Sequence, residues 1–536
     1  MVDINEVKKH NSDKDCWVII HKKVYDVTKF LPEHPGGSGI ILKYAGKDAT
    51  KAFDPIHPSD VLTKYLPPEC CLGEVEGELE SKPKKQLTKE VKVDSNVAMV
   101  DEYDVEYDEQ EDKQAINFPV PAQLSSQDDE DDEDDEVDEY EIERRKYEKG
   151  KPDIGQIYNL TDFEFVARYT MDKIAWGYYS SGCDDEITMR FNHIAYHRYF
   201  FKPRVLVDVT NIDLSTTMLG TKCDSPFYVT ATALGKLGHP EGEIVLTRNA
   251  AKHNIIQMIP TLASCSFDEI VDAAIDEQTQ WLQLYVNSDR DIVEKMLKHA
   301  MNRGIKAIMI TVDAPQLGRR EKDMRSKDFE DTSYVQNEDN SVDRSQGAAR
   351  AISSFIDTGL KWDDLKWFKK ILNIPIILKG IQTVEDSLKA IEYGVDGIIL
   401  SNHGGRQLEF SKPPIDVLFE LNEYFKKNNT TKPENFEIFI DGGVRRASDI
   451  LKAICLGAKG VGIGRPFLYA MSTYGDDGVY KAMQILKDEM IMNMRLLGVT
   501  KIEELNDSFI EKGDLKVDDK LFNGVYQPLE HPKFKL

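Results

Sequence analysis

Residues 397–407 read GIILSNHGGRQ, a short apolar run joined to a polar tip. GIIL has the length and composition of a buried β-strand, and the glycine pair after it is typical of a turn. In that turn His403 can accept a proton near neutral pH, and Arg406 can bind a carboxylate through two parallel hydrogen bonds. A single histidine at a strand end is more often structural, so the interpretation as a site for an acid substrate depends on partners elsewhere in the chain.

Seven further apolar runs of strand length accompany this one, and stretches with helical periodicity separate them. These runs are FYVTATA (227–233), IIQMIPT (255–261), WLQLYV (281–286), AIMITVDAP (307–315), PIILKG (375–380), EIFIDGG (437–443) and GVGIGRP (460–466). Strands that alternate with helices indicate parallel βα units, and eight such units predict a (β/α)8 TIM barrel. Barrels of this type carry their chemistry at the carboxyl ends of the strands.

Polar residues gather at those ends, where a purely structural barrel would have ordinary turn residues. After strands seven and eight come two glycine loops with arginines, 441–445 and 464–465, at the place where such barrels hold a phosphate. Asp313 is suited to orient His403, or is a simple turn residue. Lys379 is suited to face a cofactor that becomes anionic, or forms an ordinary salt bridge. The other tip residues are Thr232, Ala233, Gln283, Tyr285 and Thr311.

The composition bounds the class of protein. The chain has 536 residues, a formal charge of -26 and seven cysteines. This length predicts two or more domains, and the acidic balance argues against nucleic acid and anionic lipid as partners. An odd cysteine count without a CxxC pair indicates a reducing compartment. No apolar run is long enough to span a bilayer and no targeting segment is recognisable, so we expect a cytoplasmic protein without membrane insertion.

Much of the charge lies in one segment. Residues 94–140 contain 20 acidic residues and one basic residue, with nine consecutive acids from Asp128 to Glu136. Such a run has no apolar spacing that would build a core, so we interpret residues 80–148 as a disordered or extended acidic linker. The alternative is a docking surface for a basic partner.

Residues 1–79 form a separate block in which short apolar strands alternate with short helical segments, and they predict a small mixed α+β domain. Within it, residues 30–37 read FLPEHPGG. Pro35 disfavours a helical conformation at His34, and the two glycines permit backbone angles that other residues resist. His34 is therefore held on a tight turn, either as a structural residue or as a ligand.

Two resemblances emerge from these motifs. Residues 155–530 resemble the FMN-dependent L-2-hydroxy acid dehydrogenase and oxidase family through YYSSG, TATALGKLGHPEGE, QLYV, TVDAP, LKGI, SNHGGRQL, DGGVRR and GVGIGRPF. Residues 1–78 resemble the cytochrome b5 haem domain through DCWVI, VYDVTKFLPEHPGG and DPIHP. The second resemblance implies haem b with His34 and His57 as axial ligands, an arrangement that favours electron transfer over oxygen chemistry.

The first resemblance implies a site for FMN and a 2-hydroxy acid, with residues 149–536 as the catalytic domain. Arg320 and Arg406 would hold the substrate carboxylate, and His403 would be the base, oriented by Asp313. The remaining substrate contacts are implied for Tyr178, Tyr285, Ala233 and Leu262, and the cofactor contacts for Thr232, Gln283, Thr311, Lys379, Asp441, Gly443, Arg445, Gly464 and Arg465.

The fusion of both domains resembles the haem-carrying branch of the family. It implies oxidation of L-lactate to pyruvate, with electrons passed through the haem to cytochrome c. The small Ala233 beside Leu262 favours lactate over larger 2-hydroxy acids, and Pro260 stands where relatives commonly carry a small hydroxylic residue. An oxygen-using oxidase, another 2-hydroxy acid substrate and a barrel without catalysis are the alternatives.

Three expectations concern the outer parts of the molecule. Residues 321–350 are predicted to form a mobile lid, or an ordinary surface insertion. The resemblance implies a homotetramer, with residues 517–536 as a candidate arm between subunits. It also offers the mitochondrial intermembrane space as an alternative to the cytoplasm.

Overall fold

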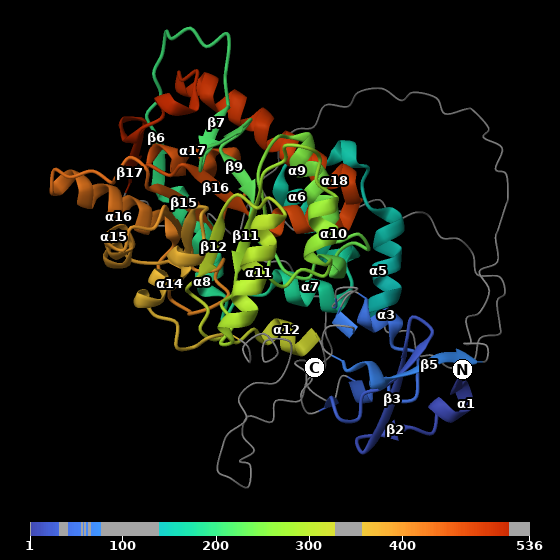
Figure 1. The fold of residues 1–536 in the computed structure, drawn as a ribbon. Helices are drawn as coiled ribbons and strands as arrows, with labels where there is room; N and C mark the ends of the chain where they lie inside the picture. The colour runs from blue at the N-terminus through green and yellow to red at the C-terminus, as the bar shows by residue number, and fades with distance from the viewer. Residues whose placement is uncertain are drawn as a thin grey trace, which may run out of the picture. The chain divides into compact units, whose positions relative to one another are not determined.

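The computed structural model describes residues 2–31, 41–54, 57, 61–62, 66–76, 139–326 and 356–513. Eight parallel strands close into a barrel in the order in which they follow along the chain, which confirms the predicted TIM barrel (Figure 1). Six strands fall within runs that the sequence singled out, and β11 and β13 each extend one residue beyond theirs. The strands are β9 (Phe227–Val229), β10 (Gln257–Ile259), β11 (Gln280–Leu284), β12 (Ile308–Thr311), β13 (Ile376–Ile381), β14 (Gly397–Leu400), β15 (Glu437–Asp441) and β16 (Gly460–Ile463).

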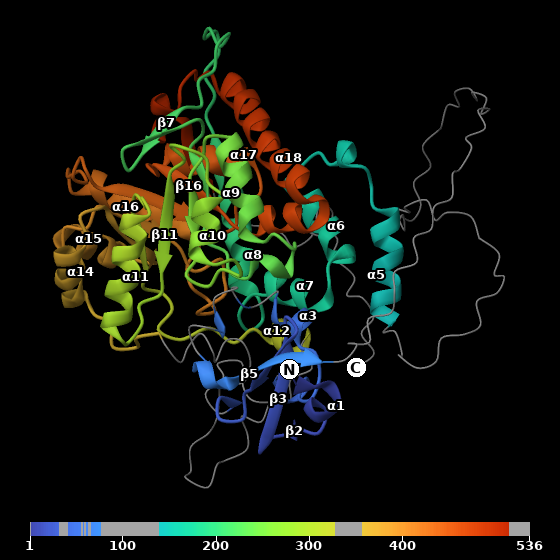
Figure 2. The same cartoon turned by 45° about the vertical axis from the view of Figure 1, so that its right-hand side comes forward.

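A helix follows each barrel strand and covers its outer face (Figures 1 and 2). The strands are buried nearly throughout and rich in isoleucine, as expected for a parallel sheet that is covered on both faces. The helices are α9 (Glu243–Lys252), α10 (Phe267–Asp272), α11 (Arg290–Asn302), α14 (Leu365–Ile371), α15 (Val384–Glu392), α16 (Pro414–Lys427), α17 (Ala447–Cys455) and α18 (Arg465–Leu497). The long α18 packs against both α9 and α6 (Leu160–Thr170).

The barrel interior is a packed core rather than a channel. Tyr228, Trp281 and Phe439 meet there edge to face, with ring centroids 5.3 to 6.0 Å apart. A hairpin of β7 (Thr216–Met218) and β8 (Thr221–Cys223) contributes Met218 and Cys223 to the same cluster. The amino-terminal end of the barrel is thereby filled, which leaves the carboxyl ends of the strands for a ligand.

Helix α5 (Glu139–Gly150) corrects one expectation. The sequence placed residues 80–148 in an extended linker, but residues 139–148 are helical. Glu141 forms ion pairs with Arg144 and Arg145 at helical spacing, and Arg144 also donates to the carbonyl of Thr170 at 3.0 Å. We therefore propose that the catalytic domain begins at Glu139. The rest of the predicted linker lies outside the described residues.

The amino-terminal part contains a five-stranded sheet, in keeping with the predicted α+β domain. Its strand order is β1-β5-β4-β3-β2. Buried residues of β3, among them Cys16, Val18 and Ile20, pack with Leu31 and Leu66 into a small core of their own. The strands are β1 (Val2–Asp3), β2 (Asn11–Ser12), β3 (Asp15–Ile20), β4 (Lys23–Asp26) and β5 (Cys71–Glu76).

Two further predictions fall mostly beyond this description. The predicted lid begins with the short helix α12 (Glu321–Ser326), while residues 327–350 and the candidate arm 517–536 lie outside the described residues. Within the described helices, none combines the length and the apolar character needed to cross a membrane.

Candidate active site

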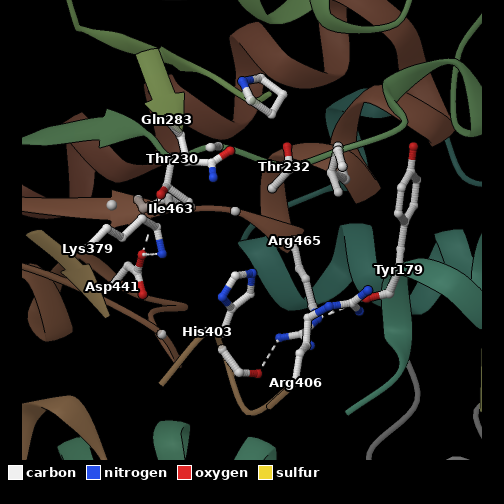
Figure 3. Close-up of a pocket in the computed structure, with 18 of the residues that line it drawn as sticks. Tyr179, Thr230, Thr232, Gln283, Lys379, His403, Arg406, Asp441, Ile463 and Arg465 are labelled. Atoms are coloured by element: carbon white, nitrogen blue, oxygen red, sulfur yellow. Dashed lines mark hydrogen bonds and ion pairs between the residues drawn. The ribbon is translucent and has the colours of Figure 1, made fainter. Parts of the chain in front are cut away.

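A cavity opens at the carboxyl ends of the barrel strands, where the sequence predicted the chemistry (Figure 3). Its empty volume, the open mouth included, is about 1070 Å³, which is large enough for a ligand of several rings together with a small substrate. Every barrel residue that the sequence assigned to the site lines this cavity except Asp313, which contacts His403 instead.

His403 follows β14 and has two polar neighbours. Its Nδ1 lies 3.1 Å from Oδ1 of Asp313, and its Nε2 lies 3.1 Å from the hydroxyl of Tyr285. An ionised carboxylate can only accept a hydrogen bond, so the network assigns the proton to Nδ1, which donates to Asp313. Nε2 therefore carries the lone pair and accepts from Tyr285. This tautomer is the one that a general base needs.

Burial sets the protonation of the pair. It lowers the pKa of His403 below the ordinary value of 6.5 and outweighs the opposite effect of Asp313. Burial by itself would raise the pKa of Asp313, but its interaction with His403 and the charge of Lys379 hold that pKa below its usual value. At neutral pH the pair therefore consists of a neutral imidazole and a carboxylate.

The loop after β14 holds His403 in an uncommon backbone conformation. Its φ is 58°, in the left-handed region that residues with a Cβ atom seldom adopt. The backbone N–H of His403 donates to Oγ of Ser401 at 3.0 Å. The side chain of Asn402 pairs with that of Asn192, on α8 (Ile187–Ile194), through two bonds of 2.7 Å. These bonds hold the strained conformation and keep the imidazole at the cavity wall.

Lys379 lies within β13 and forms an ion pair with Asp441 at the end of β15 (Figure 3). Its Nζ lies 3.0 Å from Oδ2 of Asp441, and both side chains are almost completely buried. Burial would lower the pKa of Lys379, but the carboxylates of Asp441 and Asp313 raise it above its usual value. The salt bridge that was one interpretation of Lys379 is thus present, and the cation also lines the cavity.

Two arginines make one side of the cavity strongly positive. The guanidinium of Arg406 lies 5.0 Å from the ring centroid of Tyr178 and donates to the carbonyl of the same residue at 2.8 Å. Arg320 is buried, and its burial together with the charge of Arg406 lowers its pKa to about 10. The bonds of Arg320 go to neutral oxygens of Arg406 and Gln407. A bound carboxylate would reduce the repulsion between the two cations.

The opposite end of the cavity offers backbone donors. Gly443 has a φ of 80°, and a Cβ atom there would lie 2.2 Å from the backbone of α8, so the loop requires glycine. Arg445 on this loop pairs with Glu164 at 3.1 Å. Gly464 is the residue before α18, and it places the positive end of that helix at the cavity. This end of the cavity suits a phosphate.

Arg465 lines the cavity but uses its guanidinium as a brace. Nε donates to the carbonyl of Tyr179 at 2.9 Å (Figure 3). Nη1 donates to the carbonyl of Gly404 at 3.0 Å, and Nη2 donates to that of Ser181 at 2.9 Å. The side chain thus ties the start of α18 to α7 (Lys173–Ser180) and to the loop after β14. Its backbone N–H, at the helix terminus, is the donor that suits an anion.

A third wall of the cavity is apolar. Ala233 follows β9, Leu262 follows β10, and Leu317 comes from the segment before α12. Pro260 lies in the same lining and carries no N–H group. These residues give this part of the cavity lining an apolar character.

Tyr179 and Ser401 are among the residues of the site that sequence reasoning missed. Tyr179 lines the cavity beside Tyr178, and its hydroxyl donates to the carbonyl of Leu234 at 2.6 Å. The resemblance implied a substrate contact only for Tyr178, the first tyrosine of YYSSG. Ser401 bridges the ammonium of Lys379 and the backbone of His403, and no motif marks a serine for that role.

One of the two predicted haem ligands lies among the described residues. Nδ1 of His57 is 3.1 Å from the carbonyl oxygen of Phe53, and the two rings stack with centroids 4.4 Å apart. Because a carbonyl only accepts, Nδ1 carries the proton and Nε2 carries the lone pair. Metal-binding histidines are commonly oriented by such a bond. His34 lies outside the described residues.

Comparison with known families identifies both parts of the chain. Residues 167–512 match the profile of the FMN-dependent dehydrogenases, and residues 3–76 match that of the cytochrome b5-like haem or steroid binding domain.

Known proteins with the same arrangement are similar over nearly the whole chain. The chain is 49% identical to an L-lactate dehydrogenase (cytochrome) of Wickerhamomyces anomalus, over 99% of this chain and 84% of that protein. It is 47% identical to the protein of the same description from Saccharomyces cerevisiae, over 97% and 82% of the two chains. A crystal structure of the flavin-binding domain of baker's yeast flavocytochrome b2 is 49% identical, with a TM-score of 0.65 over 74% of this chain and 99% of that one.

Proposed function

The chain belongs to the FMN-dependent dehydrogenase family and carries a cytochrome b5-like domain ahead of the barrel, and on this premise we propose that it is an L-lactate dehydrogenase that reduces cytochrome c. The observation that carries the proposal is the presence of both domains in a chain similar throughout to two yeast enzymes of that description. When bound, FMN takes two electrons from L-lactate to leave pyruvate, and the b-type haem passes them singly to cytochrome c.

The cavity fits FMN at both of its ends. The loop with Gly443 and Arg445 supplies donors suited to the phosphate. At the other end Lys379 supplies a buried cation that would stabilise negative charge on the ring system. Gln283 and Thr311 also line the cavity, and the bond from Nε2 of Gln283 to Oγ1 of Thr311 at 2.8 Å fixes these two polar side chains at the cavity wall. The other residues proposed to contact FMN are Thr232, Asp441, Gly464 and Arg465.

The substrate is held by its carboxylate. Arg406 and Arg320 provide the two guanidinium groups whose mutual repulsion a carboxylate relieves. The hydroxyls of Tyr178 and Tyr285 supply further hydrogen bonds, and the Tyr285 hydroxyl stands 3.1 Å from Nε2 of His403. A ligand bonded to Tyr285 is therefore within reach of the base.

His403 takes the proton that the oxidation releases. Nε2 has the lone pair, and Asp313 stabilises the imidazolium that forms when this nitrogen is protonated. The proton comes either from Cα or from the hydroxyl group of the substrate. Both routes leave it on the same nitrogen, so the arrangement of His403 and Asp313 serves either.

His57 and His34 are the proposed axial ligands of the haem. The bond from His57 to the carbonyl of Phe53 fixes the tautomer that a ligand requires. With two imidazoles as ligands, the haem would be suited to pass electrons on rather than to bind oxygen.

The first experiment is an anaerobic visible spectrum before and after addition of L-lactate. Loss of flavin absorbance together with the appearance of reduced-haem bands is the expected result. A flavin that is reduced while the haem stays oxidised, with peroxide formed in air in proportion to pyruvate, would favour the oxygen-using alternative. No change in either cofactor would refute lactate as the substrate.

Assembly and compartment remain predictions. We propose a homotetramer, which light scattering of the purified protein tests. The cytoplasm and the mitochondrial intermembrane space are the two candidate compartments, and immunoblots of cell fractions distinguish them.

A further inference from the structure

Glu243 is a completely buried carboxylate outside the cavity. It is the first residue of α9, and none of its side chain is exposed. The N–H groups of Gly235 and Ser264 donate to its Oε1 at 2.8 and 3.0 Å, and the N–H of Cys265 donates to its Oε2 at 3.1 Å. These partners are backbone amides rather than cations. A buried carboxylate is costly unless such bonds satisfy it, so the contacts are held firmly.

The three amides belong to two different loops. Gly235 lies in the loop after β9, two residues beyond Ala233. Ser264 lies in the loop after β10, two residues beyond Leu262. The loops also bond directly, because the N–H of Leu234 donates to the carbonyl of Leu262 at 3.1 Å. Ala233 and Leu262 therefore lie on two loops that are both held by Glu243.

The loop after β9 is clamped in a strained form. Leu234 has φ 60° and ψ 48°, a left-handed conformation that is costly for a leucine. On one side the hydroxyl of Tyr179 donates to its carbonyl at 2.6 Å. On the other side the next residue, Gly235, is held by Glu243, and a Cβ atom there would lie 2.8 Å from Cδ of that glutamate. Without the clamp this conformation would relax and move Ala233.

We infer that Glu243 is a positioning residue that sets the separation of Ala233 and Leu262 and thereby restricts the substrate to a short side chain. Glu243 does not line the cavity and acts through the two loops. The inference rests on the proposed function, because it takes the space between Ala233 and Leu262 to hold the side chain of the 2-hydroxy acid. One methylene group in such a pocket changes kcat/KM by about 10- to 200-fold, so small movements of its walls are measurable.

The test is the variant E243Q in the full-length holoenzyme. The amide oxygen can still accept from two backbone N–H groups, but the NH2 group would face the N–H of Cys265, which is also a donor. We expect the ratio of kcat/KM for L-lactate to that for L-2-hydroxybutyrate to fall roughly tenfold, mainly through KM. FMN occupancy, read from the flavin absorbance, serves to confirm that the holoenzyme is intact.

Two further variants make the result decisive. E437Q is the matched control: Glu437 is partly buried and accepts from the N–H of Leu219 at 2.9 Å, away from both loops, so the ratio should not change. Y179F removes the hydrogen bond to the carbonyl of Leu234 and should also lower the ratio of kcat/KM for L-lactate to that for L-2-hydroxybutyrate. If E243Q does not fold, E243D, which keeps the charge but shortens the reach, is measured with Y179F instead.

The outcomes separate the inference from the proposed function. Wild-type protein that is reduced by L-lactate, with an unchanged ratio in FMN-loaded E243Q, overturns the inference alone. If E243Q does not fold, an unchanged ratio in both E243D and Y179F does the same. Wild-type protein that L-lactate does not reduce overturns the proposed function, and the inference with it.

Discussion

The carboxylate of Asp313 occupies the space that a side chain at Gly380 would need. A Cβ atom at that position would lie 2.4 Å from Cγ of Asp313, and the φ of Gly380 is 107°. Gly380 belongs to β13, directly after Lys379. Asp313, which orients His403, therefore fits only because Gly380 on the neighbouring strand has no side chain.

G380A should disable the enzyme by moving Asp313. We expect flavin reduction by L-lactate to slow by about 100-fold, because misplacing a catalytic group by about 1 Å costs that much. Stopped-flow absorbance of the flavin measures the rate. G304A is the matched control, since Gly304 has a φ of 89° but nothing within 4 Å of a new Cβ atom. It should lose about 1 kcal/mol of stability and no activity, and equal losses of activity in the two variants would contradict the assignment.

The pH dependence of kcat/KM should report His403. The base acts when it is neutral, and burial lowers its pKa, so activity should rise with pH along a limb whose midpoint lies below 6.5. Asp313 opposes that shift, so D313N should move the limb to still lower pH and reduce kcat by roughly 10²- to 10⁴-fold. D416N removes a carboxylate that binds Tyr199 at 2.7 Å outside the cavity, and its profile should match the wild type. A shift of the rising limb of kcat/KM to higher pH in D313N would refute the pairing of His403 with Asp313.

K379M should destabilise the fold because it leaves Asp441 without its ion-pair partner. The change leaves Asp441 as an unpaired charge in the barrel, and breaking a buried ion pair from one side costs about 3–5 kcal/mol. The double variant K379M/D441L removes both charges and should regain much of the lost thermal stability. Neither variant should regain normal flavin reduction. A single variant as stable as the wild type would show that the pair contributes nothing to folding.

H57A should separate the two halves of the electron path. We expect loss of the haem absorbance and of cytochrome c reduction, while L-lactate still reduces the flavin. H21A is the control, because Nε2 of His21 pairs with Asp54 at 2.7 Å on the exposed surface of the same domain. Haem retained by H57A, or lost equally from H21A, would remove His57 from the ligand set.

The barrel and most of its site were predictable from local sequence. A strand buried on both faces must be a short apolar run, and its polar end must lie where the chain leaves the sheet, so GIILSNHGGRQ contains both the strand and the position of His403. The charged run around residues 128–136 and the helical spacing of Glu141, Arg144 and Arg145 are also local features. The predicted linker nevertheless extended to residue 148, because the acidic composition outweighed this spacing, whereas residues 139–150 are helical.

The amino-acid sequence by itself determined which residues have the chemistry: a base, two arginines, a buried lysine and glycine loops at strand ends. Tertiary structure alone decided how these groups are held. Glu243 binds amides from two loops, Tyr179 supports the loop that carries Ala233, and Asp313 fits against Gly380. These contacts join residues distant in sequence through backbone atoms, which are the same in every residue and leave no pattern in the order of side chains.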